Sequence, residues 1–201
     1  KTTLVDILLG LLKPTSGDIS LDGSEIIKLG LRKWQNSIGY VPQNIFLSDK
    51  TVAENIAFGH SLEQLNIERV KEVCKIACLH EFITEELDQN YFTEVGERGI
   101  RLSGGQRQRI GIARAISKLP TLLILDEATS GMDRNLEREI RYNLKNLYSK
   151  PTILLISHNV DTLKDCESII FFKKFNEIKV GKFSKLLKDN EFKSLLTSFN
   201  D

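Results

Sequence analysis

The sequence predicts an α/β fold in which a parallel sheet is buried between helices. Two apolar runs, residues 122–125 and 153–156, have the length of strands and contain no charged residue. Strands that are covered on both faces of a sheet have this composition. Stretches with helical spacing of apolar residues lie before and between them, such as residues 61–87. A chain of 201 residues with 41% hydrophobic and 27% charged residues is large enough for one α/β domain with a sizeable core.

The first helix is predicted over residues 1–12, where apolar side chains recur every three or four positions. These are Leu4, Ile7, Leu8, Leu11 and Leu12. Residues 13–18, with the sequence KPTSGD, are rich in helix breakers and predict a turn. Residues 19–23 alternate in polarity, which indicates a short strand.

The next elements lead into a long helical region. Residues 29–36 predict a short helix, and residues 38–41 predict a strand that Pro42 ends. Residues 61–87 are expected to be largely helical, with one apolar face and a charged, solvated face. Nothing in this helical region predicts a catalytic role.

Residues 101–109 read RLSGGQRQR and contain the start of the next predicted helix, which runs from Ser103 to Ile116. The start of a helix has unpaired N–H groups and the positive end of the helix dipole. Gly104 and Gly105 would let those N–H groups come close to an anion. The stretch therefore predicts a phosphate site.

Pro120 ends that helix, and the following residues 121–127 read TLLILDE. An apolar strand that ends in two carboxylates, Asp126 and Glu127, provides the oxygen ligands that a Mg²⁺–phosphate site needs. A capped helix and a core strand with an acidic end would explain either stretch alone. The two stretches in this order favour a phosphate site with Mg²⁺.

The last third of the chain continues the alternation. A helix is predicted from about residue 135 to residue 147, then the strand ending at residues 153–156, and a last strand over residues 166–172. Between these strands His158 follows a buried strand directly, 32 residues after Asp126. A lone histidine is more often structural, so its position at the strand end is what makes it a candidate.

LSGGQ followed by LLILDE resembles the nucleotide-binding domain of ABC transporters, the ATP-driven membrane pumps. Leu102 and Asp126 are 24 residues apart, as in that family. The resemblance extends over essentially the whole chain, through further segments such as KPTSGDISLDG, residues 39–43 and residues 51–56.

The resemblance implies a P-loop NTPase (RecA-like) core with an inserted α-helical subdomain. Residues 1–59 would form the first part of the core, with an incomplete P-loop and the Q-loop. Residues 60–117 would form the helical subdomain with the signature motif. Residues 118–201 would form the second part of the core and the C-terminal tail.

The resemblance also implies that the chain binds ATP with Mg²⁺. Lys1 would reach the β- and γ-phosphates, Thr2 would ligate Mg²⁺, and Thr3 would lie beside the nucleotide. Gln43 matches the Q-loop glutamine, whose amide can ligate Mg²⁺ and position water. Asp126 would hold Mg²⁺ through water.

Two further residues would act in hydrolysis by the same resemblance. Glu127 is the candidate general base that takes a proton from the attacking water. His158 matches the switch histidine, which contacts the γ-phosphate and orients water and Glu127.

The phosphate predicted at the signature helix belongs, by resemblance, to ATP held by a second nucleotide-binding domain in a head-to-tail dimer. Ser103, Gly104, Gly105 and Gln106 would contact it. Asp133 lies in the D-loop, where residues 130–133 read SGMD instead of the usual SALD. This departure weakens the expectation that Asp133 couples the two sites.

The chain opens with Lys-Thr-Thr, the end of the pattern G-x-x-x-x-G-K-[ST] without its glycines. We therefore expect it to be a piece of a longer polypeptide, one that on its own binds ATP poorly and has weak or no ATPase activity. The strand before the P-loop is central in the family's sheet, so the isolated piece is also expected to be unstable.

Residues 93–99, TEVGERG, resemble a segment of exporter-type domains that faces the membrane partner. This implies a transmembrane domain fused upstream, a place at the cytoplasmic face of a membrane, and export of a lipid, glycolipid, peptide or drug. No predicted apolar run in the chain is long enough to cross a bilayer.

Two other functions remain open. One is a soluble ABC-family ATPase in DNA repair or translation, although a net charge of +1 gives no reason to expect nucleic acid as a partner. The other is a non-hydrolysing regulatory subunit, which the incomplete P-loop and altered D-loop permit. Intact Glu127 and His158 count against that second alternative.

Two groups of side chains have structural interpretations. Cys74 and Cys78 are four residues apart, so they should share a helix face, and with Cys166 they are interpreted as buried thiols. Arg107, Arg109 and Arg114 could form a phosphate or nucleic-acid patch. Surface charge and local ion pairing are the favoured interpretation of these three arginines.

Overall fold

The computed structural model describes residues 1–26, 30–59, 62–129, 131–173 and 177–198. The chain divides into two compact units, Lys1–Ile156 and Ser157–Asp201. Each unit is described by itself below. The secondary structure mixes helices and strands, which confirms the predicted α/β class.

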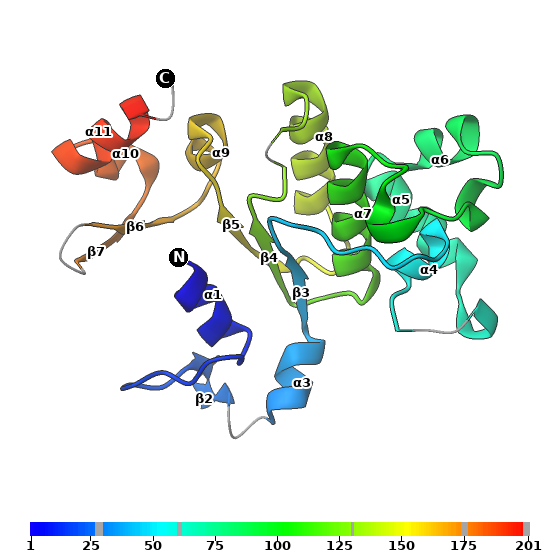
Figure 1. Cartoon of the computed structure of the whole chain (residues 1–201). Coiled ribbons are helices and arrows are strands. Elements are labelled where there is room, and N and C mark those ends of the chain that lie inside the picture. The colour runs from blue at the N-terminus through cyan, green and yellow to red at the C-terminus, as the bar shows by residue number, and fades with distance from the viewer. Residues whose placement is uncertain (27–29, 60–61, 130, 174–176, 199–201) are drawn as a thin grey trace. The chain divides into compact units, whose positions relative to one another are not determined.

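The centre of the first unit is a three-stranded parallel sheet in the order β3-β4-β5 (Figure 1). Its strands are β3 (Ile38–Val41), β4 (Leu122–Asp126) and β5 (Thr152–Ile156). The middle strand β4 is buried, as its uncharged run predicts, and in register Gly39 pairs with Leu123 and Asp126 with Ile156. The three predicted strands are therefore confirmed, and their carboxyl ends lie at one edge of the sheet.

Helix α1 (Thr2–Leu8) packs Val5 on this sheet in a cluster with Trp34, Ile38 and Ile124. It is shorter than the predicted helix over residues 1–12. The indole of Trp34 donates a hydrogen bond to the Leu8 carbonyl oxygen at 2.6 Å, and Gly10 turns the chain with a φ of 69°. Because these contacts end the helix, Leu11 and Leu12 are exposed instead of lying on its apolar face.

A small hairpin and a short helix follow. Strands β1 (Ser20–Leu21) and β2 (Ser24–Glu25) pair antiparallel across Asp22 and Gly23, which both have positive φ, as this tight turn requires. Helix α3 (Leu31–Asn36) confirms the short helix predicted over residues 29–36, although Leu29 lies outside the described residues.

The region predicted as largely helical consists of several short elements. Within residues 61–87 they are η1 (Leu62–Gln64), α5 (Ile67–Ile76) and α6 (His80–Glu86). Helix α4 (Val52–Ile56) precedes this region, and the short helices η2 (Asn90–Phe92) and η3 (Glu97–Gly99) follow it. Ser61, where the prediction began, lies outside the described residues. Cys78 adopts a φ of 52° between α5 and α6, in the left-handed region that ends a helix.

The prediction that Cys74 and Cys78 share a helix face is therefore wrong, because α5 ends before Cys78. Cys74 is buried, and burial raises the pKa of its thiol to about 12. Cys78 and Cys166 are only partly buried, so the interpretation as buried thiols is correct for Cys74 alone.

Two longer helices complete the first unit: α7 (Gly104–Ser117) and α8 (Arg134–Lys145). Ser103 is the N-cap of α7, which confirms the predicted start of that helix. Helix α7 buries Ile110, Ile112 and Ile116 in the largest core cluster and approaches β3 closely. A Cβ added to Gly39 would lie only 2.6 Å from the Ala115 carbonyl oxygen.

The second unit is a small hairpin covered by helices. Its elements are α9 (Val160–Lys164), β6 (Ile169–Phe172), β7 (Ile178–Gly181), α10 (Phe183–Leu186) and α11 (Asn190–Ser198). Strand β6 begins three residues later than predicted, and its antiparallel partner β7 was not predicted from the sequence. The core of this unit consists of Ile169, Phe171, Leu186, Phe192 and Leu196.

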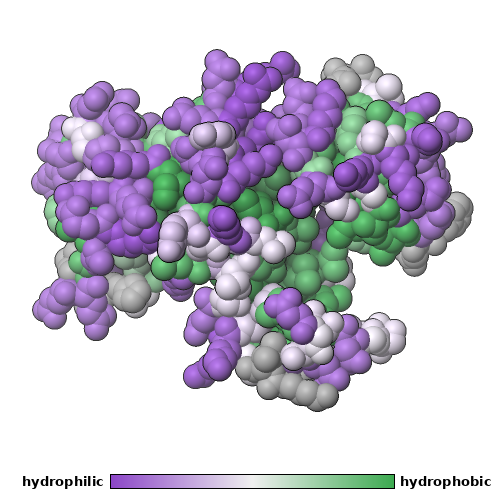
Figure 2. All heavy atoms as spheres, turned by 180° about the vertical axis from the view of Figure 1, so that it is seen from behind, coloured by the Kyte–Doolittle hydropathy of each residue, from purple (hydrophilic) through white to green (hydrophobic). Residues whose placement is uncertain are grey.

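The exterior is mainly hydrophilic on the face drawn in Figure 2, with apolar side chains in patches between the polar ones. Several large apolar side chains are exposed, among them Phe46, Phe58, Phe92 and Ile100. None of the helices among the described residues is long and apolar enough to pass through a bilayer.

Candidate functional site

Asp126 and Glu127 lie where the buried strand β4 ends. Asp126 is its last residue, and the Glu127 N–H donates to the carbonyl oxygen of Ile156 at 3.0 Å. Glu127 has a φ of 51°, which is uncommon for a residue other than glycine and is often found at functional sites. Burial, and then the neighbouring Glu127 carboxylate, raise the pKa of Asp126, whereas Lys1 lowers it.

Gln43 comes two residues after β3, the neighbour of β4 in the sheet. Its amide Nε2 donates a hydrogen bond to Glu127 Oε2 at 2.8 Å. The parallel strands place their carboxyl ends together, so these side chains meet although 84 residues separate them in the chain. Of the predicted site residues, Gln43, Asp126 and Glu127 thus gather at one edge of the sheet.

The start of α1 belongs to the same unit. Lys1 is the N-cap of α1, and Thr2 and Thr3 form its exposed first turn. The packing of Val5 on Ile124 holds the helix against the strand that carries Asp126. The influence of the Lys1 charge on the pKa of Asp126 places the ammonium group within electrostatic reach of that carboxylate.

The start of α7 is built by a reciprocal cap. Ser103 Oγ accepts a hydrogen bond from the Gln106 N–H at 3.2 Å, and the Ser103 N–H donates to Gln106 Oε1 at 2.7 Å. Neither Gly104 nor Gly105 has a positive φ, and a Cβ added to either would meet no atom within 4 Å. Internal packing therefore gives no reason for glycine at these two positions, and the space beside them is open to an incoming group.

Asp133 and His158 have other surroundings. Asp133 is the N-cap of α8, and its Oδ1 accepts from the N–H groups of Asn135 and Leu136 at 2.8 and 3.4 Å. Ser130 of the D-loop lies outside the described residues, and Gly131 has a φ of 81°. His158 is exposed, two residues after β5 and within the second unit, so its predicted contact with the site stays a prediction.

The favoured interpretation of the three arginines of α7, surface charge and local ion pairing, is wrong. All three are partly buried and donate to backbone carbonyl oxygens, a role that suits the five donors of a guanidinium group. The acceptors are those of Leu102 and Gly99 for Arg107, Cys78 and Gly105 for Arg109, and Phe46 and Asn55 for Arg114.

Asn55 of α4, a fully buried amide that contacts the loop after Gln43, was not predicted from the sequence as a functional residue. Asn55 lies between the apolar Ala53 and Ile56, both buried in α4. A polar residue within such a short buried segment was the available signal, because a buried amide needs hydrogen-bond partners.

Comparison with known proteins identifies a family. The family model described as "ABC transporter" matches residues 1–130. An ABC transporter B family member 15 from Arabidopsis thaliana is 37% identical over 198 residues, which are 98% of this chain and 16% of that protein. An ATP-dependent lipid A-core flippase from Methylococcus capsulatus is 41% identical over 187 residues, 93% of this chain and 31% of the flippase.

A solved structure of a bacterial Atm1-family ABC exporter with ATP bound is similar over 98% of this chain, with a TM-score of 0.90 and 32% identity. The match covers 34% of the exporter chain. The chain thus spans about a third or less of these three relatives. The parallel sheet agrees with the P-loop NTPase core of such proteins. The chain therefore belongs to the ABC transporter family, as an ATP-binding domain of the kind found in its exporter-type members.

Proposed function

We propose that this chain binds and hydrolyses ATP as the nucleotide-binding part of an exporter whose transmembrane domain is fused upstream. The observation that carries the proposal is the Gln43–Glu127 hydrogen bond at the sheet edge, directly beside Asp126. Phosphoryl transfer to water needs groups that position the water and accept its proton more than it needs covalent chemistry. An amide, a carboxylate base and a second carboxylate supply these groups.

Each residue has a distinct task in this proposal. Glu127 takes a proton from the attacking water, while the Gln43 amide holds the Glu127 carboxylate and the water in place. Lys1 neutralises negative charge on the β- and γ-phosphates, and Thr2 and Thr3 of the first turn of α1 lie at the same end. A contact between His158 and the γ-phosphate stays a prediction from the resemblance.

The residues present also fit Mg²⁺. No cluster of three or more His, Cys, Asp or Glu side chains suited to a metal occurs in the part of the chain that is described. Mg²⁺ is commonly bound by one or two carboxylates together with phosphate and water oxygens, and Asp126, Thr2 and Gln43 offer such a set of oxygens. Bound Mg²⁺ would supply positive charge beside the phosphates and beside the Asp126 carboxylate, whose pKa is raised first by burial and then by Glu127.

The second half of the site comes, in this proposal, from another nucleotide-binding domain arranged head to tail. The open space at Gly104 and Gly105 supports this, because no described residue would meet a Cβ added at either position. Ser103, Gly104, Gly105 and Gln106 of one domain would contact the γ-phosphate of ATP bound by the other, with Asp133 nearby. ATP would thus join the two domains, and hydrolysis would let them separate.

We further propose the division into residues 1–59 and 118–201 as the core and residues 60–117 as the helical subdomain. The exposed Phe46, Phe58, Phe92 and Ile100 support contact with a transmembrane domain, because large apolar side chains at a surface often mark an interface. The chain would then work at the cytoplasmic face of a membrane. The transported substrate would be a lipid, glycolipid, peptide or drug.

The test is Glu127→Gln in the full-length polypeptide that contains this chain, with Glu85→Gln on the exposed side of α6 as the control. Loss of the general base should slow phosphate release by roughly 10²–10⁴-fold. The ATP-bound dimer should persist, as measured by crosslinking or size-exclusion chromatography. If Glu127→Gln hydrolyses ATP as fast as Glu85→Gln does, the proposed role of Glu127 is wrong.

A further inference from the structure

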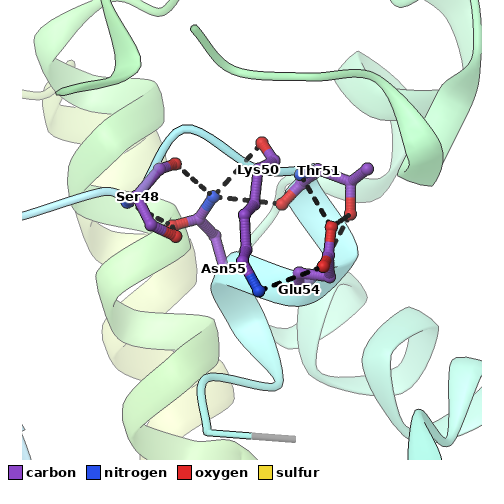
Figure 3. A network of polar contacts seen from close by, with 5 residues as sticks. All are labelled: Ser48, Lys50, Thr51, Glu54 and Asn55. Atoms are coloured by element: carbon purple, nitrogen blue, oxygen red, sulfur yellow. Dashed lines mark hydrogen bonds and ion pairs between the residues drawn. The ribbon is translucent and has the colours of Figure 1, made fainter. Parts of the chain in front are cut away.

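The loop that follows Gln43, residues 44–51, is organised by one buried side chain. This is Asn55 of α4, whose exposure is 0%. Asn55 Oδ1 accepts from the N–H and the hydroxyl of Ser48 at 2.9 and 3.2 Å. Its Nδ2 donates to the carbonyl oxygens of Ser48 and Thr51, both at 3.0 Å (Figure 3). One amide thus satisfies buried backbone groups at both ends of the segment from residue 48 to residue 51.

The start of α4 is fixed beside this amide. Thr51 and Glu54 form a reciprocal cap, and Lys50 forms an ion pair with Glu54 at 3.4 Å (Figure 3). The loop therefore enters α4 at a defined point, and Asn55 is held one residue beyond that cap.

Arg114 joins this network to α7, the helix that begins after Ser103. Its Nε donates to the Asn55 carbonyl oxygen at 2.7 Å, its Nη1 to the Phe46 carbonyl oxygen at 2.9 Å, and its Nη2 to Asn55 Oδ1 at 3.3 Å. The guanidinium carbon lies 5.0 Å from the centre of the Phe58 ring, within cation–π range. A single side chain of α7 thus holds both the loop and α4.

The loop also lies tightly on α7. A Cβ added to Gly111 would come within 2.5 Å of Ile45 Cδ1 and 3.0 Å of Ile45 Cγ1, so this glycine makes room for the loop. Leu47 is buried, with an exposure of 1%. Only Asn44 separates this docked segment from Gln43, whose amide reaches Glu127. The docked loop and β3 therefore hold the chain on both sides of Gln43.

We propose that Asn55 and Arg114 are positioning residues for ATP hydrolysis, which act by holding the loop on α7 so that the Gln43 amide stays against Glu127. This inference rests on the proposed function. It assigns neither residue a contact with nucleotide: each acts through Gln43. Their effect should appear in kcat and depend on the presence of the Gln43 side chain.

The test is a double-mutant cycle in the full-length polypeptide with Arg114→Lys and Gln43→Ala. Lysine keeps the charge but cannot donate to three acceptors in a fixed plane. A displaced Gln43 should lower kcat by about tenfold, since small misplacements of positioning groups have large effects. The KM for ATP should stay within about twofold, and in the Gln43→Ala background Arg114→Lys should change kcat by less than about twofold.

Arg69→Lys is the matched control. Arg69 also bridges two elements, donating from α5 to the carbonyl oxygens of Ser117 and Ile116 at 3.3 and 2.9 Å, and both of these acceptors lie outside the loop. Its effect on kcat should be small and should be the same with and without Gln43. Equal factors for Arg114→Lys in both backgrounds, or a loss that appears in KM alone, would overturn the inference.

A second pair of variants covers the case in which Arg114→Lys does not fold. Gly111→Ala should displace the loop at Ile45 and lower kcat several-fold, and adding Ile45→Val should restore part of kcat because it removes Cδ1, the nearest atom that the new methyl group meets. An unchanged kcat in Gly111→Ala, or a loss that Ile45→Val fails to restore, contradicts the inference.

The two proposals fail in different ways. If Glu127→Gln retains normal hydrolysis, the proposed catalytic roles are wrong. If Glu127→Gln is inactive while the Arg114 and Gln43 effects multiply independently, only the positioning role is wrong.

Discussion

Gly39 in β3 lies where α7 comes closest to the sheet, and Gly39→Ala is a sharp test of that packing. The added Cβ would lie 2.6 Å from the Ala115 carbonyl oxygen and 3.1 Å from both Leu123 Cδ1 and Pro120 Cγ. The nearest atom belongs to the backbone of a buried helix, so it cannot rotate away. Helix and strand must separate, or the strand must shift.

The magnitude follows from this contact. Overpacking of a core by one methyl group destabilises the folded state by about 1–3 kcal/mol. Because the added methyl group of Gly39→Ala meets a backbone oxygen, we expect the upper end of this range, about 3 kcal/mol. Alanine restricts the unfolded chain more than glycine does, and this stabilises the folded state by about 0.4–1 kcal/mol. The net loss of about 2 kcal/mol lowers the folding equilibrium constant roughly 30-fold. With a urea m-value of about 2 kcal/mol/M, the unfolding midpoint should fall by about 1 M.

The assay is urea unfolding followed by tryptophan fluorescence. Trp34 is the only tryptophan of the chain and is buried in the cluster that contains Ile38, so its emission reports on the sheet beside Gly39. Gly105→Ala is the control, because its added Cβ meets nothing within 4 Å, and its midpoint should not fall. If Gly39→Ala unfolds at the same urea concentration as Gly105→Ala, the close contact between α7 and β3 is not what the structure shows.

Two carboxylates should respond to pH in opposite directions. Burial and Glu127 raise the pKa of Asp126, so its charged form is disfavoured in the folded chain; Asp126→Asn should therefore raise the urea midpoint at pH 7. That gain should shrink as the pH falls toward the ordinary value of roughly 3.9, and a midpoint at pH 7 that is lower than in the unsubstituted chain would contradict the reasoning. In the second unit, a hydrogen bond from Lys179 at 2.6 Å, N–H groups at the start of α11 and the Lys173 ammonium hold the pKa of Asp189 well below its usual range. The stabilisation from Asp189 is present above the ordinary pKa and is lost as the pH falls below it, so Asp189→Asn should speed amide hydrogen exchange in residues 169–196 at pH 7 and have less effect at lower pH. Equal exchange rates at pH 7 with and without the Asp189 carboxylate would rule out this role.

Local patterns allowed several elements to be predicted from the sequence. The strand over residues 38–41 matches β3 in both bounds, and Ser103 is the N-cap that its position before two glycines indicates. Asp126 and Glu127 stand at the end of a buried strand, as the apolar run before them predicts. These features depend on periodicity, capping chemistry and a buried strand's lack of charge, and all of these are present within a few residues of sequence.

The tertiary structure decided the features that depend on contacts between distant segments. Helix α1 ends at Leu8 because Trp34 binds its last carbonyl group, and the arginines of α7 are partly buried because backbone carbonyl groups of other elements face them. The Gln43–Glu127 hydrogen bond arises from the parallel pairing of β3 with β4. By itself the sequence determined the core strands β3, β4 and β5 and the start of α7, because propensity and capping act locally. Which side chains meet was decided by packing, because burial brings together groups that are far apart along the chain.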